Sequence, residues 1–180
     1  MTRSPWLVPV TVLRRSLGNR MVENRSGFVG ELRVGDSVVA ADVQVTTEAV
    51  LASVDGGVEV TASVTAVWSG RCRRCLRPVG GILSPEVREL YRQRHPGEPP
   101  DQDEETYPLV GEMLDLRPMV RDALLLNMPI APLCDEGCRG LCPSCGEDLN
   151  EGDCLCPPVA PDPRWAALDV LQPPGGGSSG

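Results

Sequence analysis

The longest alternation of hydrophobic and polar residues along the chain lies between residues 42 and 69. Successive side chains of a strand point to opposite faces, so every second residue shares a face. In residues 58–69 that face is apolar throughout: Val58, Val60, Ala62, Val64, Ala66 and Trp68. Residues 42–54 alternate in part, with Val43 and Val45 on one face, and Asp55-Gly56-Gly57 between the two segments is typical of a tight turn. The pattern therefore predicts a β-hairpin.

Weaker β signals precede this hairpin. Residues 6–14 predict a strand at a sheet edge, because Pro9 has no N–H to donate to a neighbouring strand. Residues 15–27 are polar and contain glycine, which favours a loop, and short extended segments follow around 28–34 and 36–40.

A further extended segment follows the hairpin. Residues 79–91, after Pro78, are expected to turn back along the sheet. The Cys72-Arg-Arg-Cys75 motif lies between this segment and the preceding strand, so we expect it at the tip of a second hairpin.

One helix is predicted after residue 115. Asp115 is expected to cap it, Pro118 is tolerated in its first turn, and Pro129 ends it by Met128. Its apolar stripe, which indicates packing on the sheet, comprises Leu116, Met119, Val120, Ala123, Leu124 and Asn127, widened by Leu125 and Leu126.

The expected fold class is α+β, with a mainly antiparallel, twisted β-sheet, one packed helix and a C-terminal cysteine-rich, zinc-binding extension. Residues 1–130 form the β-rich domain, interrupted by a flexible acidic loop at 95–108. Residues 131–172 form the extension and include a short helix over 161–172. The Gly/Ser-rich tail 173–180 is expected to be disordered.

Charge and hydropathy narrow the functional classes. The net charge of -8 argues against wholesale binding to a phosphate backbone, although all 17 basic residues are arginine. The apolar run 6–13 is too short to span a membrane, contains Pro9 and leads into Arg14 and Arg15. We therefore expect a cytoplasmic protein with reduced cysteines, which makes disulfides the weaker interpretation.

Six of the eight cysteines lie within the 23 residues 134–156. A structural zinc site takes four ligands, usually from two short-spaced pairs. Cys142-Pro-Ser-Cys145-Gly is a strong first pair, because proline presets the turn and glycine permits a positive φ after the second ligand. Cys154-Leu-Cys156 supplies a second pair, since residues i and i+2 of an extended chain project to one side.

The four remaining thiols would form a second site that ties the hairpin tip to the chain leaving the helix: Cys72, Cys75, Cys134 and Cys138. In a rival partition, Cys72 and Cys75 join Cys142 and Cys145, which leaves the other four poorly bound. The spacing therefore predicts one or two structural Zn²⁺ ions.

Four arginines flank the first cysteine pair: Arg71, Arg73, Arg74 and Arg77. A zinc ion with four thiolates carries a charge of about -2, which these arginines would offset. Contact with RNA is the competing interpretation, and the sequence does not decide between the two.

Catalytic patterns are weak. Cys72 and Cys75 could act as a redox dithiol because nearby arginines lower a thiol pKa, but the predicted β flanks do not match a thioredoxin-like motif. His95 is the one histidine, and no Ser-His-Asp set or phosphate-binding glycine loop can be drawn. We therefore expect a protein that is not an enzyme and has no small-molecule substrate.

Three stretches together resemble the YceD family of large ribosomal RNA subunit accumulation proteins, in its cysteine-rich Gram-positive form. They are C-R-R-C-L-R-P, D-L-R-P-M-V-R-D-A-L-L-L-N-M-P, and the run from Leu133 to Asn150 with its closing C-x-C. The resemblance spans about residues 6–170. It implies a bacterial factor for synthesis, processing or stability of large-subunit (23S) ribosomal RNA. The expected partner is ribosomal RNA or a basic large-subunit ribosomal protein, and no membrane.

Overall fold

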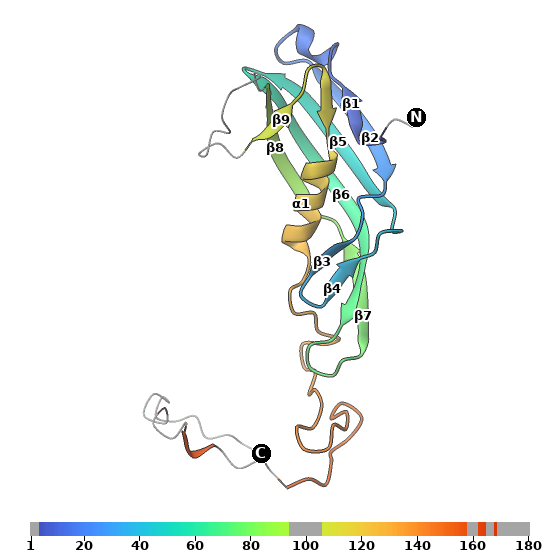
Figure 1. The fold of residues 1–180 in the computed structure, drawn as a ribbon, viewed down its shortest axis with the longest axis vertical. Coiled ribbons are helices and arrows are strands. Elements are labelled where there is room, and N and C mark those ends of the chain that lie inside the picture. Colours follow the sequence, from blue (N-terminus) through green and yellow to red (C-terminus); the bar gives the residue numbers. More distant parts are fainter. Residues whose placement is uncertain (1–3, 94–105, 158–161, 165–167, 169–180) are drawn as a thin grey trace. The chain divides into compact units, whose positions relative to one another are not determined.

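The computed structural model describes residues 4–93, 106–157, 162–164 and 168. The chain divides into two compact units, residues 1–138 and 139–180. In its described residues, the first unit is a mainly antiparallel, twisted β-sheet with one packed helix, and a cysteine-rich segment follows it in the sequence (Figure 1). The expected α+β class is confirmed.

Strand β6 (Gly57–Arg71) is the spine of the sheet. Its first half is flanked by β5 (Val45–Val54) and β8 (Glu86–Gln93), both antiparallel to it. Its second half is flanked by β4 (Ser37–Val39) and β7 (Pro78–Leu83). This single strand therefore runs from the core of the sheet to the β6–β7 turn and fixes the position of that turn relative to the core.

The central hairpin is confirmed. Val54 pairs with Gly57, so the turn consists of Asp55 and Gly56, with Gly56 at φ 78°, and Gly57 already belongs to β6. The predicted face of β6 is buried from Val58 to Ala66, while Trp68 is half-buried.

Three outer strands complete the sheet. β3 (Leu32–Val34) pairs with β4, and β9 (Tyr107–Leu109) lies parallel to β8. β2 (Arg20–Gly27) pairs antiparallel with β5.

Strand β2 falls in residues 15–27, so the prediction of a loop there was wrong. Its side chains alternate only between exposed and half-buried until Gly27, so its sequence lacks the apolar face that marks a strand. Backbone pairing with β5 along its whole length holds it extended.

The predicted strand over 6–14 is shorter than expected. β1 (Leu7–Pro9) pairs with β10 (Met113–Asp115), and among the described strands these two form a separate sheet. The chain then turns into the 3₁₀ helix η1 (Leu13–Arg15), which buries Leu13.

The single break in the strand predicted over 79–91 lies at Ser84-Pro85, between β7 and β8. Proline 85 has no N–H for the ladder, but its carbonyl accepts a hydrogen bond from the N–H of Val64 at 3.0 Å. The two segments consequently follow one another along β6.

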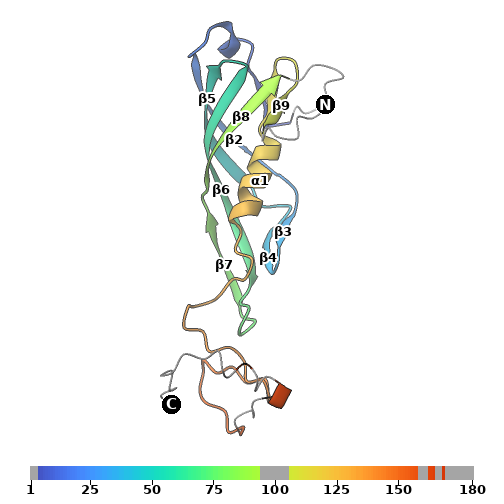
Figure 2. The same ribbon diagram turned by 90° about the vertical axis from the view of Figure 1, so that its left-hand side faces the viewer.

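Helix α1 (Arg117–Asn127) lies across one face of the sheet (Figure 2). Its N-cap residue is Leu116 rather than the predicted Asp115, whose carboxylate instead accepts the N–H of Arg117 at 3.0 Å. Met128 is the extended C-cap residue before Pro129, as predicted. The buried stripe is narrower than expected, because Leu126 and Asn127 are exposed.

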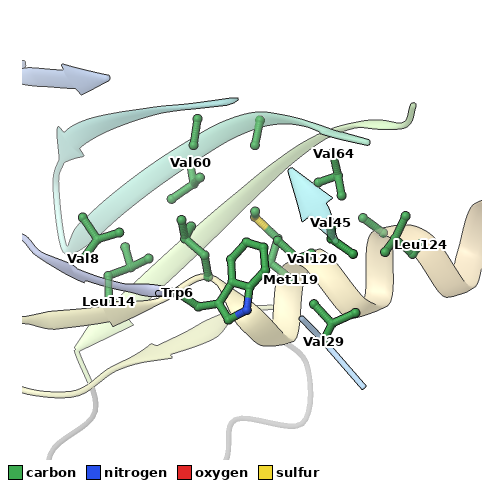
Figure 3. Close-up of a cluster of buried hydrophobic side chains, with 14 of the residues drawn as sticks. Trp6, Val8, Val29, Val45, Val60, Val64, Leu114, Met119, Val120 and Leu124 are labelled. Carbon is green, nitrogen blue, oxygen red and sulfur yellow. The ribbon is translucent and has the colours of Figure 1, made fainter. Parts of the chain in front are cut away.

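The core lies between the sheet, α1 and the β1–β10 pair (Figure 3). Trp6 is buried, and its indole N–H donates to the carbonyl of Phe28 at 3.2 Å. Its own carbonyl accepts the N–H of Leu116 at 3.0 Å, which joins β1 to the start of α1. Figure 3 shows Trp6 beside Met119 and Val120 of α1.

Several predictions fall partly outside the described residues. β9 begins at Tyr107, inside the predicted loop 95–108, and most of that loop is not described. The tail 173–180 and most of the predicted helix 161–172 also lie outside. The domain boundary at residue 130 stays a prediction. No helix among the described residues is both long and apolar enough to cross a membrane.

Leucines 124 and 126 of α1 test the packing face of the helix. Leu124→Ala should lower the free energy of unfolding by about 2 to 5 kcal/mol, because Leu124 is fully buried and its loss leaves a cavity. Leu126→Ala should change it by less than about 0.5 kcal/mol, because Leu126 is 85% exposed. Urea unfolding at a fixed metal concentration measures both, and equal losses would contradict this packing.

Candidate metal centres

The eight thiols gather into two groups of four, and the sulfur atoms within each group all lie within 4.8 Å of one another. Cluster one comprises Cys72, Cys75, Cys134 and Cys138; cluster two comprises Cys142, Cys145, Cys154 and Cys156. These are the two sets that the spacing favours. Cluster one lies within residues 1–138 and cluster two within 139–180.

The first half of cluster one is the tight turn between β6 and β7. Cys72 donates its N–H to the carbonyl of Arg77 at 2.8 Å, and Leu76 donates its N–H to the carbonyl of Cys72 at 2.9 Å. Leu76 adopts φ 60°, a left-handed conformation that is rare outside glycine. The expected position of this motif at a hairpin tip is confirmed.

The second half of cluster one comes from the chain that leaves α1, residues 129–138, here named the strap. The buried hydroxyl of Ser37 donates to the carbonyl of Pro129 at 2.6 Å. The N–H of Arg73 donates to the carbonyl of Pro132 at 2.8 Å. A Cβ on Gly35 would approach the carbonyl oxygen of Ile130 to 2.3 Å, so the β3–β4 turn needs glycine there. The strap is thus anchored before its cysteines begin.

Arg74 holds the last part of the strap. Its Nη1 donates to the carbonyls of Glu136 at 3.1 Å and Cys138 at 2.8 Å. A side chain from the first cysteine pair therefore fixes the backbone between the second pair. This role was missed from the sequence, which gives no signal of which carbonyls an arginine will meet.

The sulfur atoms of cluster one face one another across the two segments. Cys72 Sγ lies 3.7 Å from Cys138 Sγ, and Cys75 Sγ lies 3.5 Å from Cys134 Sγ. Cys72 and Cys75 are buried, while Cys134 is exposed.

Cluster two repeats the same turn within a short stretch. Cys142 donates its N–H to the carbonyl of Glu147 at 2.8 Å, and Gly146 donates its N–H to the carbonyl of Cys142 at 2.8 Å. Gly146, at φ 79°, occupies the position of Leu76 in cluster one. Cys154 Sγ lies 3.3 Å from Cys142 Sγ.

The loop between the two pairs of cluster two closes on itself. Leu149 donates its N–H to the carbonyl of Gly140 at 2.9 Å, and Asn150 Oδ1 accepts the N–H of Arg139 at 2.8 Å. The Arg139 guanidinium also pairs with the Asp153 carboxylate, one residue before Cys154. Local contacts therefore bring the closing Cys-x-Cys back to the first pair.

Both sets of distances fit a tetrathiolate metal site. Zinc–sulfur bonds of about 2.3 Å at tetrahedral angles separate the sulfurs by about 3.8 Å. A disulfide would require about 2.05 Å, and none of the eight cysteines, all of which are described, is in a disulfide. Four sulfur donors suit zinc and other soft metal ions rather than magnesium or calcium.

The pKa values of the clustered thiols also favour a bound metal ion. Backbone N–H donors, that of Cys75 first, lower the pKa of Cys72 to about 6. Hydrogen bonding to Cys75 raises the pKa of Cys134 to about 12. Cluster two repeats this contrast: donors led by the N–H of Cys145 lower the pKa of Cys142 to about 6. Four thiols held this close oppose full ionisation, and a divalent cation would remove that opposition.

The arginines around cluster one differ in their contacts. Arg73 forms an exposed ion pair with Asp36 at 3.8 Å, and Arg74 binds the strap carbonyls. Arg71 and Arg77 are exposed. Contact of these four residues with RNA stays a prediction.

The sequence is similar to a known protein family and to several related proteins. A family model described as large ribosomal RNA subunit accumulation protein YceD matches residues 60–172. An uncharacterized protein of Mycobacterium tuberculosis is 35% identical over 175 residues, covering 92% of this chain and 83% of that protein. One from Mycobacterium leprae is 32% identical over 127 residues, covering 67% of this chain and 56% of that protein.

A plant relative carries the family's name. The chloroplast protein of Arabidopsis thaliana called large ribosomal RNA subunit accumulation protein YCED homolog 1 is 30% identical over 71 residues. That match covers 39% of this chain and 22% of the plant protein. No solved structure matches the chain significantly.

The two equivalent turn positions allow a matched test. Gly146→Leu should weaken metal binding at cluster two roughly tenfold, because a left-handed backbone costs a branched residue about 1 to 2 kcal/mol. Nothing lies within 4 Å of the added Cβ, so sterics contribute little there. Leu76→Gly should leave binding at cluster one unchanged or tighter. Competition with a chromophoric chelator measures both, and tighter binding by Gly146→Leu would contradict the shared turn.

Proposed function

Because the chain belongs to the YceD family of large ribosomal RNA subunit accumulation proteins, we propose that it is a non-enzymatic ribosome-biogenesis factor. It supports the synthesis, processing or stability of large-subunit ribosomal RNA. The main support for this proposal is that the family match over 60–172 includes both four-thiol clusters. The family's description names an accumulation role and no reaction.

Each cluster is proposed to hold one structural Zn²⁺. The two sets of donors are Cys72, Cys75, Cys134 and Cys138, and Cys142, Cys145, Cys154 and Cys156. A four-thiolate site has no open coordination position for a substrate, so the ion would contribute folding energy rather than reactivity. In cluster one this would join the β6–β7 turn to the strap.

The burial of Cys72 and Cys75, and the other thiols close to them, argue against the alternative in which this pair is a catalytic redox dithiol. Cys72 is 0% exposed and Cys75 is 5% exposed, whereas a catalytic thiolate must be reached by its substrate. Each also lies within 4.8 Å of two further thiols, more than a dithiol motif supplies.

Charge supports a basic large-subunit ribosomal protein as the direct partner. The net charge of -8 suits a cationic surface. Among the arginines proposed for RNA contact, Arg74 binds the strap carbonyls and Arg73 pairs with Asp36, so both already have partners within the protein. A cytoplasmic site of action is part of the same proposal.

Paired substitutions test the metal assignment. The purified protein should contain two zinc ions, and Cys72→Ser with Cys75→Ser should leave one. Cys142→Ser with Cys145→Ser should likewise leave one, and all four substitutions together should leave none. Mass-spectrometric metal analysis with thiol counting reads the result. One zinc and four reactive thiols in the unaltered protein would contradict two closed sites.

Deletion of the gene tests the ribosomal role. Mature large-subunit RNA should fall relative to small-subunit RNA, and a wild-type copy should restore it. Quantified subunit profiles in sucrose gradients measure the ratio. An unchanged ratio in the deleted strain would overturn the proposed function without bearing on zinc content.

Binding measurements separate the two partner classes. The protein should bind a basic large-subunit ribosomal protein and show no affinity for ribosomal RNA in filter binding at low salt. RNA binding that weakens when Arg71 and Arg77 are changed to Ala would contradict the protein-partner proposal.

A further inference from the structure

Strand β2 lies at the end of the sheet, with β5 on one side and no described strand on the other. It is eight residues long and pairs with β5 without interruption from Arg20 to Gly27. A strand of this length with one free edge is a template for pairing with another chain.

The hydrogen-bond pattern fixes which groups face the free edge. Val54 and Gly57 close the two-residue β5–β6 turn, so even-numbered residues of β5 bond to β6. Odd-numbered residues bond to the β2 side, as the N–H of Ser53 does to the carbonyl of Asn19 at 2.9 Å. The odd residues of β2 face them. The backbone groups of Val22, Asn24 and Ser26 therefore point outward.

The edge carries one pair of opposite charges on the core face of the sheet. Glu23 lies opposite Ala49 and Arg25 opposite Thr47, and both of those β5 residues are buried. The side chains of Glu23 and Arg25 are 21% and 27% exposed and form an ion pair at 2.8 Å. Arg25 Nε is buried without an acceptor among the described residues, so the guanidinium has unused donor capacity.

These charges select one register for antiparallel pairing with a second copy. Centring the two-fold axis on Asn24 places each Glu23 opposite the Arg25 of the other chain, and Val22 opposite Ser26. Moving the two-fold axis by one residue, to Glu23 or to Arg25, places that residue opposite its own copy in the other chain. Like charges directly opposite one another are unfavourable. Placing the axis midway between two residues sets outward-facing groups against inward-facing ones. Larger movements of the axis leave much of β2 unpaired.

We propose that two copies of this chain associate through antiparallel pairing of β2, with Asn24 at the two-fold axis and Glu23 opposite Arg25. The free edge ends near Phe28, because the carbonyl of that residue already accepts the Trp6 indole N–H. Charged residues that point inward usually protect an edge from indiscriminate pairing. In this protein, the same charged residues favour the one register in which each Glu23 faces an Arg25 of the other copy.

Charge exchange in the purified chain tests the register. Sedimentation velocity over a range of concentrations should show a dimer of the unaltered chain. Glu23→Arg alone and Arg25→Glu alone should each weaken dimerisation about tenfold or more, because two like-charge pairs replace two matched ones. The double variant Glu23→Arg with Arg25→Glu should restore the dimer.

Mixing the two single variants gives the sharpest arm. Each chain of one variant then meets complementary charges on the other, so native mass spectrometry should show a heterodimer at a concentration where each variant alone is monomeric. Glu59→Arg, which disrupts the exposed Glu59–Arg88 ion pair on β6 and β8, is the matched control and should leave dimerisation unchanged. Unaltered zinc content and circular dichroism establish that each variant is folded.

Two outcomes would overturn the proposal. The first is an unaltered chain that stays monomeric at every concentration. The second is a pair of folded single variants that dimerise as well as the unaltered chain, or that form no heterodimer when mixed.

Discussion

Cluster one requires four sulfur atoms from distant segments to meet within a few ångströms. Cys72 and Cys138 are 66 residues apart, and their sulfurs lie 3.7 Å from each other. Closing so long a loop costs only slightly more entropy than closing a short one, because the cost grows with the logarithm of length. The fold meets the requirement in two steps: β6 carries the first pair to the β6–β7 turn, and α1, packed on the sheet, directs the strap back to it. The Ser37 hydroxyl and the backbone N–H of Arg73 then donate to strap carbonyls and fix the strap.

Cluster two meets the same chemical requirement by local means. Its two pairs are separated by one compact loop, and its first turn has the hydrogen bonds of the turn in cluster one. The shared turn brings backbone N–H groups to the first sulfur, which lowers the pKa of Cys72 and Cys142 alike. Residues 139–180 therefore contain all the ligands of their own cluster, while cluster one depends on the sheet.

Much of this architecture was predictable because local signals and tertiary packing agree. The Asp55-Gly56 turn and the alternation of β6 require no distant partner to be recognised, and Pro129 marks the end of α1. Strand β2 was missed because pairing with β5, not a pattern of its own, holds it extended. The Asp115 cap was one residue out, since the backbone of Leu116 already turns into the helix. Cysteine spacing favoured the observed grouping, but the roles of Gly35, Ser37 and Arg74 depend on where the strap lies, which no local signal records.

Both clusters are proposed to be closed tetrathiolate zinc sites, and the link between sheet and strap depends on cluster one. X-ray absorption at the zinc edge of the purified protein tests this proposal most directly, because the fine structure reports both the ligand type and the bond length. Two closed sites should give an average shell of four sulfurs at about 2.3 Å around each zinc. A shell containing nitrogen or oxygen ligands, or fewer than four sulfurs, would contradict the proposal.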